Sequence, residues 1–268
     1  MSPIKEPHHF NTDDPDGIKD RDAYLALFEP ATKKHKIIGE ASVRYLYSEN
    51  AVTNILAEHP GSRFLVMLRN PVDMAYAMHQ QALFAYIEDI PDFRQAWDMQ
   101  NARKSGGPLP PNCRHWSHLQ YGDYCLLGRQ VKRLLSVAPR ESCHFIFMED
   151  LAEFPEREWT QLIDFLQVEH DGRKVFPKEN SAKNRLFPNL TRPLYFAGKA
   201  LRARFPHSRP LHRALQAVDN LLRAQRSRPS LSEETRQMLQ AYFDDDISLL
   251  AGLTGRSLDH WRAPFRRA

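Results

Sequence analysis

An arginine stands where a short apolar segment gives way to a helix-starting proline. Residues 64–68 are all apolar, and Arg69-Asn70-Pro71 follows them directly. In open α/β sheets, ligands bind beyond the carboxyl ends of the strands, and the free N–H groups of a helix N-terminus attract phosphate. A guanidinium adds a bidentate donor that suits phosphate. The pattern predicts a phosphate site at Arg69; the alternative is that Arg69 pairs with a neighbouring acid and Pro71 only begins a helix.

A second group of reactive side chains lies near the N-terminus, where Glu6, His8 and His9 stand within four residues. A carboxylate and an imidazole at this spacing can carry out acid–base chemistry. The alternative is an ordinary solvated terminus. Because adjacent histidine side chains diverge and no third ligand is evident, the segment is a poor metal site, and we expect no metal.

A third candidate is the basic segment of residues 178–185, which contains Lys183 and Arg185. A polar, basic loop at this place in the chain can close over an anion. A plain surface loop is the alternative.

Strands and helices are needed to position these groups, and the apolar pattern predicts both. Residues 36–40, 64–68 and 144–148 are short apolar runs followed by polar residues, as expected for parallel strands that are covered on both faces. Helical patterns lie between and after them, at 48–57 with Ser48 as the cap, 72–84 with Pro71 at the first position, 121–136 and 156–166. This alternation predicts an α/β fold around a mostly parallel sheet.

Residues 190–230 differ from the rest of the chain. Between Arg192 and Arg228 there are eight arginines and Lys199 against one acid, Asp219, interleaved with apolar residues. We interpret this segment as an appendage, a helical hairpin packed on the core with its arginines outward. The alternatives are contact with an anionic membrane surface or with nucleic acid. A helix capped by Ser232 and running to about residue 253 is expected to return to the core.

The composition limits the possible number of domains, the cellular compartment and the presence of membrane segments. The chain has 268 residues, 42% of them hydrophobic, and a formal net charge of +4, which suits one large domain over residues 1–268. Three cysteines give no disulfide framework, so a reducing, cytoplasmic compartment is expected. No apolar stretch approaches 18 residues, and the N-terminus has no secretory pattern.

Six ordered blocks resemble sulfotransferases that use 3′-phosphoadenosine 5′-phosphosulfate, in particular the branch of heparan sulfate and bacterial carbohydrate-type enzymes. The blocks cover most of the chain outside 190–230. They are Lys5-Glu6-Pro7-His8-His9-Phe10, Ile38-Gly39-Glu40-Ala41-Ser42 with Tyr45-Leu46-Tyr47, Arg69 to Tyr76, Tyr121-Gly122-Asp123-Tyr124, Phe147-Met148-Glu149-Asp150-Leu151 with its following helix, and the tail from Thr235 to Trp261.

The resemblance implies a fold, a P-loop-kinase-like three-layer sandwich around a parallel sheet. It also implies an activity, the transfer of a sulfuryl group to a hydroxyl or amine, with a saccharide as the expected acceptor. Such transfer depends on positioning and charge stabilisation, without a metal. By position, Glu6 matches the family's general base and His8 a residue near the acceptor. Arg69 matches the arginine that binds the donor's 3′-phosphate, and Lys183 and Arg185 fall where a basic loop closes over that phosphate.

Two departures from the family pattern stand out. The family's first strand and its Gly-x-x-Lys-x-Gly-Thr-Thr-like loop, which cradles the 5′-phosphosulfate, precede the Glu6 block, but Met1 lies only five residues before Glu6. We therefore expect Met1 to be internal and the working protein to begin upstream. Ala77 stands where the family usually has a serine that also binds the 3′-phosphate.

Two other readings remain open. A degenerate, non-catalytic relative could keep the fold and bind a sugar or a partner, which the loss of the Ala77 hydroxyl and the 5′ loop favours. A nucleotide kinase would have a related fold, but neither a Walker loop nor a Mg²⁺ site is visible in the sequence.

Overall fold

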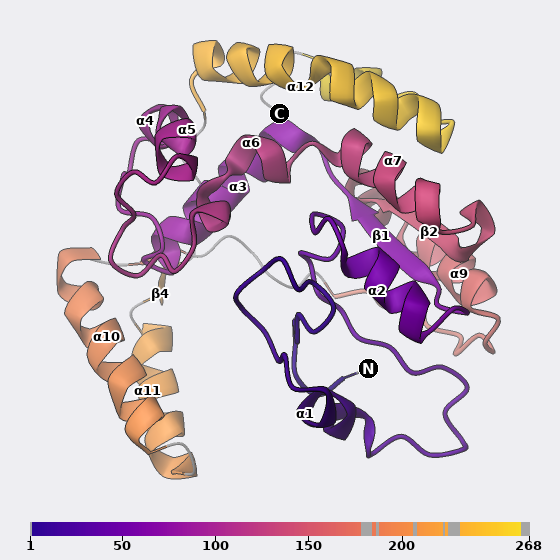
Figure 1. The fold of residues 1–268 in the computed structure, drawn as a ribbon, viewed down its shortest axis with the longest axis horizontal. Coiled ribbons are helices and arrows are strands. Elements are labelled where there is room, and N and C mark those ends of the chain that lie inside the picture. The colour runs from indigo at the N-terminus through magenta and orange to yellow at the C-terminus, as the bar shows by residue number, and fades with distance from the viewer. Residues whose placement is uncertain are drawn as a thin grey trace. The chain divides into compact units, whose positions relative to one another are not determined.

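The structure is a computed structural model that describes residues 2–177, 184–185, 188–205, 208–221, 223–224 and 231–263 (Figure 1). The chain forms two compact units. Unit 1 comprises Met1–Ala75, Gly122–Phe176 and Arg236–Ala268, and unit 2 comprises Tyr76–Tyr121 and Pro177–Thr235. The prediction of one domain over residues 1–268 stays a prediction, and each unit is described below by itself.

A pair of parallel strands forms the centre of unit 1. Strand β1, Phe64–Leu68, pairs with strand β2, Cys143–Phe147, over its whole length. Both strands were predicted, the second with a shift of one residue. Their parallel pairing across 74 intervening residues (69–142) places helices in the connection, as an α/β fold requires.

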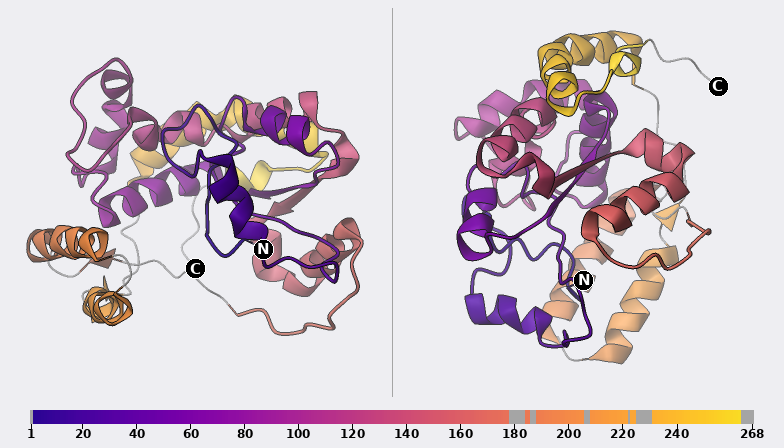
Figure 2. Two further views of the ribbon diagram at one scale, coloured as in Figure 1. Left: turned by 60° about the horizontal axis from the view of Figure 1, so that its bottom comes forward. Right: turned by 90° about the vertical axis from the view of Figure 1, so that its right-hand side faces the viewer.

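Aromatic contacts cover both faces of β2. His144 stacks on Phe165 of α9, Pro155–Leu166, with ring centroids 5.1 Å apart. Phe147, whose side chain points to the opposite face because side chains alternate along a strand, packs against Trp261 of η4, Asp259–Trp261. The predicted α/β fold with helices on both sides of a parallel sheet is thus confirmed (Figure 2).

The prediction of a strand at residues 36–40 is wrong. Two isolated backbone bonds hold this region instead: Ser2 N–H donates to Gly39 C=O (2.9 Å) and Glu6 N–H donates to Ala41 C=O (3.0 Å). An apolar run becomes a strand only when a neighbour supplies a continuous ladder, and these two bonds do not make one.

The expectation that the strands are covered on both faces also needs correction. Leu65 and Met67 of β1 are 46% and 44% exposed, whereas Val66 and Leu68 are buried. The strand therefore alternates between a core face and an exposed face.

Shorter elements complete unit 1. Ser48, the predicted cap, stands two residues before Asn50, the observed N-cap residue of the following helix, but its Oγ accepts a hydrogen bond from Ala51 N (3.0 Å) in the first turn. These elements are α1, Arg21–Leu25; η1, Ala26–Phe28; α2, Ala51–Glu58; α7, Leu127–Val137; η3, Arg140–Ser142; and α8, Met148–Glu153.

The single helix predicted at 121–136 is two helices. Helix α6, Tyr121–Tyr124, ends before α7 begins at Leu127. Between them Leu126 has φ −77° and ψ 69°, which is not helical. The apolar periodicity crosses this break unchanged, so it did not reveal the interruption.

Helix α12, Glu233–Thr254, supplies a cap to another helix. Ser232 Oγ accepts from Thr235 N (3.2 Å), as its predicted capping role requires. Farther along, the carboxylate of Asp246 accepts from the N–H groups of Gly128 (2.7 Å) and Arg129 (2.9 Å) in the first turn of α7. A Cβ at Gly128 would lie 2.3 Å from the Asp246 carbonyl oxygen, so only glycine permits this approach.

Unit 2 contains most of α3, Pro71–Phe84, which confirms the helix predicted after Arg69. Its other elements are α4, Phe93–Asp98; α5, Gln100–Lys104; η2, Trp116–Leu119; β3, Asn184–Arg185; α10, Pro188–Arg204; α11, Arg209–Leu221; and β4, Arg223–Ala224. In its described part the basic segment carries α10 and α11, and the appendage as a whole stays a prediction; Tyr86 packs against Tyr195 and Phe196 of α10, with centroids 5.2 and 5.9 Å apart. Its contact with a membrane surface is untested.

A buried ion pair holds the other end of unit 2 together. Arg103 of α5 forms two hydrogen bonds, of 2.7 and 2.8 Å, with Glu88, and Tyr121 Oη donates to the same carboxylate (2.7 Å). The arginine and glutamate side chains are 2% and 0% exposed. Burial acts to raise the pKa of Glu88, but these donors outweigh it and hold that pKa below its usual value.

Two general features follow the sequence expectation. Cys113, Cys125 and Cys143 are all buried, and none of them forms a disulfide with a described residue. In the part of the chain that the structure describes, no helix combines the length and the apolar character that a bilayer crossing demands.

Candidate functional site

Glu6 and His8 meet at the N-terminal segment of unit 1. His8 Nε2 lies 3.2 Å from Glu6 Oε2, within hydrogen-bond distance. The Glu6 side chain is 46% exposed, whereas that of His8 is 10% exposed. The arrangement presents a carboxylate to solvent while a buried imidazole fixes its orientation.

Both residues adopt backbone conformations that are unusual outside glycine. Glu6 has φ 55° and His8 has φ 50°. Left-handed conformations of this kind persist when surrounding contacts hold them, and they concentrate at functional sites. The left-handed conformations at Glu6 and His8, two residues apart, turn the two side chains toward each other.

The segment of residues 17–19 fastens His8 from one side. Ile18 N–H donates to Pro7 C=O (2.8 Å), and Lys19 Nζ donates to His8 C=O (3.1 Å) and Asn11 C=O (2.9 Å). Burial lowers the pKa of Lys19, against the opposing effect of three nearby aspartates. The Lys19 ammonium thus holds the two ends of the 8–11 turn.

The segment of residues 40–45 fastens His8 from the other side. His8 N–H donates to Ser42 Oγ (3.0 Å), and Ser42 Oγ donates to Glu40 Oε2 (2.9 Å). Tyr45 Oη accepts from the N–H groups of His9 (3.0 Å) and Phe10 (3.2 Å). Burial and the bond to Glu40 raise the pKa of Tyr45 well above its usual value, so its hydroxyl stays protonated.

Three side chains in this region keep unpartnered polar atoms, and one of these atoms is Glu40 Oε1. Within the described residues, His8 Nδ1 and both amide atoms of Asn11 are buried without a hydrogen-bond partner. Asn11 is 0% exposed. Buried polar groups are almost always satisfied in folded proteins, so these atoms indicate a place where water or a substrate group completes the network.

Arg69 lies at the carboxyl end of β1, where the sequence predicted it. Asn70 Oδ1 accepts from Val72 N (3.0 Å) and caps α3, while Asn70 Nδ2 donates to Trp261 C=O (3.1 Å). Pro71 is the first residue of α3. Arg69 is partly buried and forms no ion pair with any described residue, so its guanidinium is not neutralised by an acid there.

Helix α6 lies within electrostatic reach of both groups. Burial raises the pKa of Tyr124, and the charge of Glu6 contributes to this rise. Burial also raises the pKa of Cys125, and the charge of Arg69 opposes it. Glu6 and Arg69 therefore act electrostatically on two adjacent residues of unit 1, Tyr124 and Cys125.

The arrangement suits proton abstraction beside an anion site. A carboxylate held by a histidine can accept a proton from a hydroxyl or an amine. An unneutralised arginine at a helix N-terminus can hold a phosphate group. The sequence predicted both groups, and the structure places both in unit 1.

The two remaining predicted residues have a different outcome. Lys183 lies outside the described residues. Arg185 belongs to β3 of unit 2, where its backbone pairs with that of Arg223 in β4. Their proposed role beside a phosphate therefore stays a prediction.

Sequence reasoning included Ser42 and Tyr45 in a recognised block, but it missed the residues that hold His8 from the other side. Gly17, Lys19 and Asn11 surround it, although none lies in a recognised block. The acidic turn before Lys19, with aspartates at 13, 14 and 16, is the one signal that could have drawn attention to this lysine.

Two comparisons with known proteins bear on this site. A family model described as the sulfotransferase domain matches residues 21–185, more than half of the chain; this range includes Arg69 but not Glu6 or His8. The crystal structure of a sulfotransferase from Alicyclobacillus acidocaldarius matches with a TM-score of 0.71 and 24% identity, over 98% of this chain and 87% of that one. The structural likeness supports the fold, and the family model shows the family: the chain belongs to the sulfotransferase domain family.

Proposed function

We propose that this protein transfers a sulfuryl group from 3′-phosphoadenosine 5′-phosphosulfate to a hydroxyl or amine of a saccharide, with Glu6 as the general base. The observation that carries the proposal is the 3.2 Å contact between His8 Nε2 and Glu6 Oε2, in a segment bound on both sides. Membership of the sulfotransferase family supports the class of reaction.

The surroundings of Arg69 support 3′-phosphoadenosine 5′-phosphosulfate as the sulfuryl donor. Arg69 has no acidic partner among the described residues and stands beside the N-terminus of α3, a combination that favours a phosphate group. We assign Arg69 to the 3′-phosphate of the donor, and Lys183 and Arg185 to the same phosphate. The donor supplies the sulfuryl group, and no metal is required.

The residues of the chain would act as follows. Glu6 takes the proton of the acceptor hydroxyl or amine as that atom forms its bond to sulfur. The bond between sulfur and the 5′-phosphate oxygen breaks, and 3′-phosphoadenosine 5′-phosphate leaves. His8 keeps the Glu6 carboxylate oriented toward the acceptor, and the tight turn at residues 6–10 keeps His8 itself in place.

The test measures transfer and binding with the 268-residue chain. Transfer from labelled donor to a panel of saccharides should fall about 100-fold or more in Glu6→Gln, because a general base contributes on that order. Titration calorimetry with 3′-phosphoadenosine 5′-phosphate should show affinity about tenfold or more weaker in Arg69→Gln. Glu153→Gln, an exposed carboxylate at the end of α8, is the matched control for Glu6 and should leave both unchanged.

The outcomes separate two functions. Nucleotide binding that depends on Arg69, without transfer to any acceptor, would favour the non-catalytic binding relative. Absence of any heat with 3′-phosphoadenosine 5′-phosphate would contradict the donor assignment. Full transfer activity in Glu6→Gln would exclude Glu6 as the general base.

A further inference from the structure

Two residues, Arg69 and Asn70, connect β1 to α3, and the chain is fixed on both sides of Arg69. Leu68, at the end of β1, is fully buried and lies opposite Phe147 of β2. On the other side, Asn70 Oδ1 accepts the N–H of Val72 (3.0 Å) and caps α3. Because so short a connection has little freedom, the placement of Asn70 largely determines where the Arg69 side chain begins.

The other end of the Asn70 amide reaches a distant part of unit 1. Its Nδ2 donates to Trp261 C=O (3.1 Å), across a sequence separation of 191 residues. Trp261 is 3% exposed, and its N–H donates to the carbonyl of the buried Leu258 (2.9 Å). Capping a helix requires only the oxygen of the asparagine amide, so the bond to Trp261 serves another purpose.

Trp261 is itself anchored at the end of β2. Its Nε1 donates to Glu149 Oε1 (2.8 Å), and the same oxygen lies 2.8 Å from His260 Nε2. The indole ring packs against Phe147, the last residue of β2, with centroids 6.0 Å apart. The backbone of Trp261 thus holds the connection that follows β1, while its side chain holds the start of α8, which follows β2.

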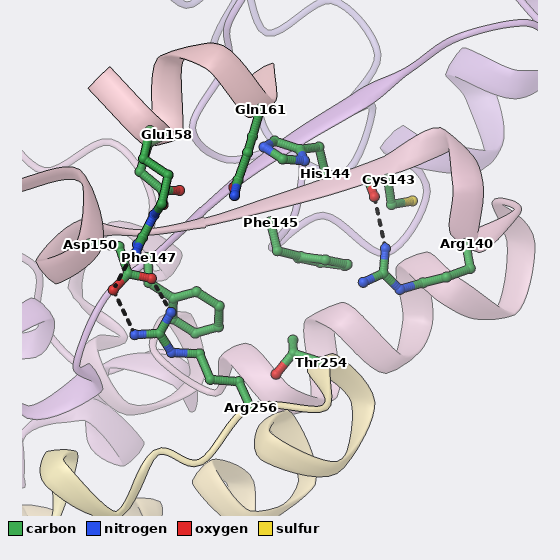
Figure 3. A pocket seen from close by; sticks show the side chains of 11 residues that line it. Arg140, Cys143, His144, Phe145, Phe147, Asp150, Glu158, Gln161, Thr254 and Arg256 are labelled. Carbon is green, nitrogen blue, oxygen red and sulfur yellow. Dashed lines mark hydrogen bonds and ion pairs between the residues drawn. The ribbon is translucent and has the colours of Figure 1, made fainter. Parts of the chain in front are cut away.

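Further contacts hold the chain on both sides of η4. Before it, Arg256 binds Asp150 through both terminal guanidinium nitrogens and lies over the Phe147 ring, 4.3 Å from the centroid (Figure 3). After it, the carbonyl of Arg262 accepts from Gln240 Nε2 of α12 (3.2 Å). The acceptor of the Asn70 amide therefore belongs to a firmly held turn.

We propose that Asn70 is a positioning residue for the phosphate site and that Trp261 is its anchor: the bond between them fixes the turn that presents the Arg69 guanidinium to the donor's 3′-phosphate. This inference rests on the proposed function, which assigns that phosphate to Arg69. Two N–H groups of an arginine bind two oxygens of one phosphate only when the backbone holds the guanidinium in place, and a displacement of about 1 Å can lose that geometry. Asn70 should therefore affect recognition of the 3′-phosphate and not of the rest of the nucleotide.

The experiment compares two nucleotides that differ only in the 3′-phosphate. The 268-residue chain and its variants are titrated calorimetrically with 3′-phosphoadenosine 5′-phosphate and with adenosine 5′-phosphate. Asn70→Ser keeps an oxygen that caps α3, because serine is a preferred N-cap residue, but it removes the amide donor to Trp261. We expect its affinity for the 3′,5′-bisphosphate to fall about fivefold or more, and its affinity for the 5′-monophosphate to stay unchanged.

A double variant tests whether Asn70 acts through Arg69. Arg69→Gln alone should weaken binding of the 3′,5′-bisphosphate about tenfold or more. Adding Asn70→Ser should cause no further loss, because the arginine that Asn70 positions is already absent. A merely structural role of Asn70 would instead give losses that add.

Two further variants locate the effect. Trp261→Phe keeps the backbone carbonyl and an aromatic ring but removes the bond to Glu149, so it should weaken the 3′,5′-bisphosphate selectively even if Asn70→Ser fails to fold. Asn112→Ser is the matched control. Asn112 Nδ2 donates to Ala85 C=O (3.0 Å), just after the opposite end of α3, and its loss should leave both affinities unchanged.

The outcomes separate this inference from the proposed function. If the parent chain shows no preference for the 3′,5′-bisphosphate, Arg69 holds no 3′-phosphate and both proposals fail. If the parent chain shows a preference that depends on Arg69, but Asn70→Ser and Trp261→Phe retain it in full, only the positioning role is overturned. Equal weakening of both nucleotides in Asn70→Ser would also overturn it.

Discussion

Gly17 shows how a single residue can determine the conformation of the Glu6–His8 segment. It has φ +101°, and a Cβ there would lie 2.5 Å from His8 Cβ and 2.6 Å from the carbonyl oxygens of Pro7 and His8. Atoms essentially never approach this closely, and left-handed backbone adds strain to any side chain. Gly17 therefore sets how near the 17–19 segment comes to His8.

We predict that Gly17→Ala lowers the free energy of unfolding by about 2 kcal/mol or more and reduces transfer activity, since the turn that holds His8 must open. Urea denaturation and the transfer assay check this. Gly61→Ala is the control, because its Cβ would meet nothing within 4 Å and its φ is not in the left-handed range. Equal urea midpoints for the two variants would show that the close approach at Gly17 has no energetic weight.

The connections between elements depend on polar pairs buried within each unit. Glu88 follows α3, Arg103 belongs to α5, and Tyr121 begins α6, and the three meet around one carboxylate. Breaking such a pair by removing one partner leaves the other charge buried and uncompensated. This cluster therefore ties the segment after α3, helix α5 and Tyr121 to one another within unit 2.

Arg103→Met should lower the free energy of unfolding by about 3–5 kcal/mol, measured by urea denaturation. Arg94→Met provides the comparison, because Arg94 forms an exposed i,i+4 pair with Asp98, and such pairs contribute about 0.3–0.5 kcal/mol. A loss of less than about 1 kcal/mol in Arg103→Met would mean that Glu88 finds another partner or becomes protonated at little cost.

Across the whole molecule, the fully buried His79 and the partly buried His144 make stability depend on pH. Burial lowers the pKa of His79 in unit 2, and burial together with Arg140 lowers the pKa of His144 in unit 1, where Glu158 acts in the opposite direction. In the unfolded chain both titrate near pH 6.5, so below that pH the unfolded state binds more protons than the folded state. Stability must then fall as the pH decreases.

We predict a lower free energy of unfolding at pH 5.5 than at pH 7.5, with a slope of at most about 1.4 kcal/mol per pH unit for each histidine. The contribution of His144 should be the smaller one, because solvent screens its partly buried ring. Urea denaturation at both pH values measures the change. The double variant His79→Gln/His144→Gln should flatten the dependence, and an unchanged slope would assign the effect to other groups.

The sequence predicted those elements of the fold that depend on neighbouring residues, and it failed for those that depend on contacts between distant segments. The strand, turn and helix around Arg69 were predicted correctly because an apolar run and a helix-starting proline determine them locally. Residues 36–40 carry a similar apolar signal but form no strand, because a strand needs a partner that the signal does not describe. The break at Leu126 was missed for a related reason, since the apolar pattern crosses it unchanged.

The candidate site divides in the same way. The sequence by itself determined the chemical types present, namely Glu6, His8 and Arg69, and the α/β order of the elements that carry them. Only the tertiary structure decided that segments 17–19 and 40–45 hold His8 in a left-handed turn, and that Asp246 caps α7 from more than 100 residues away. Local propensity is encoded in neighbouring residues, whereas hydrogen bonds between distant segments form only once the chain has brought those segments together.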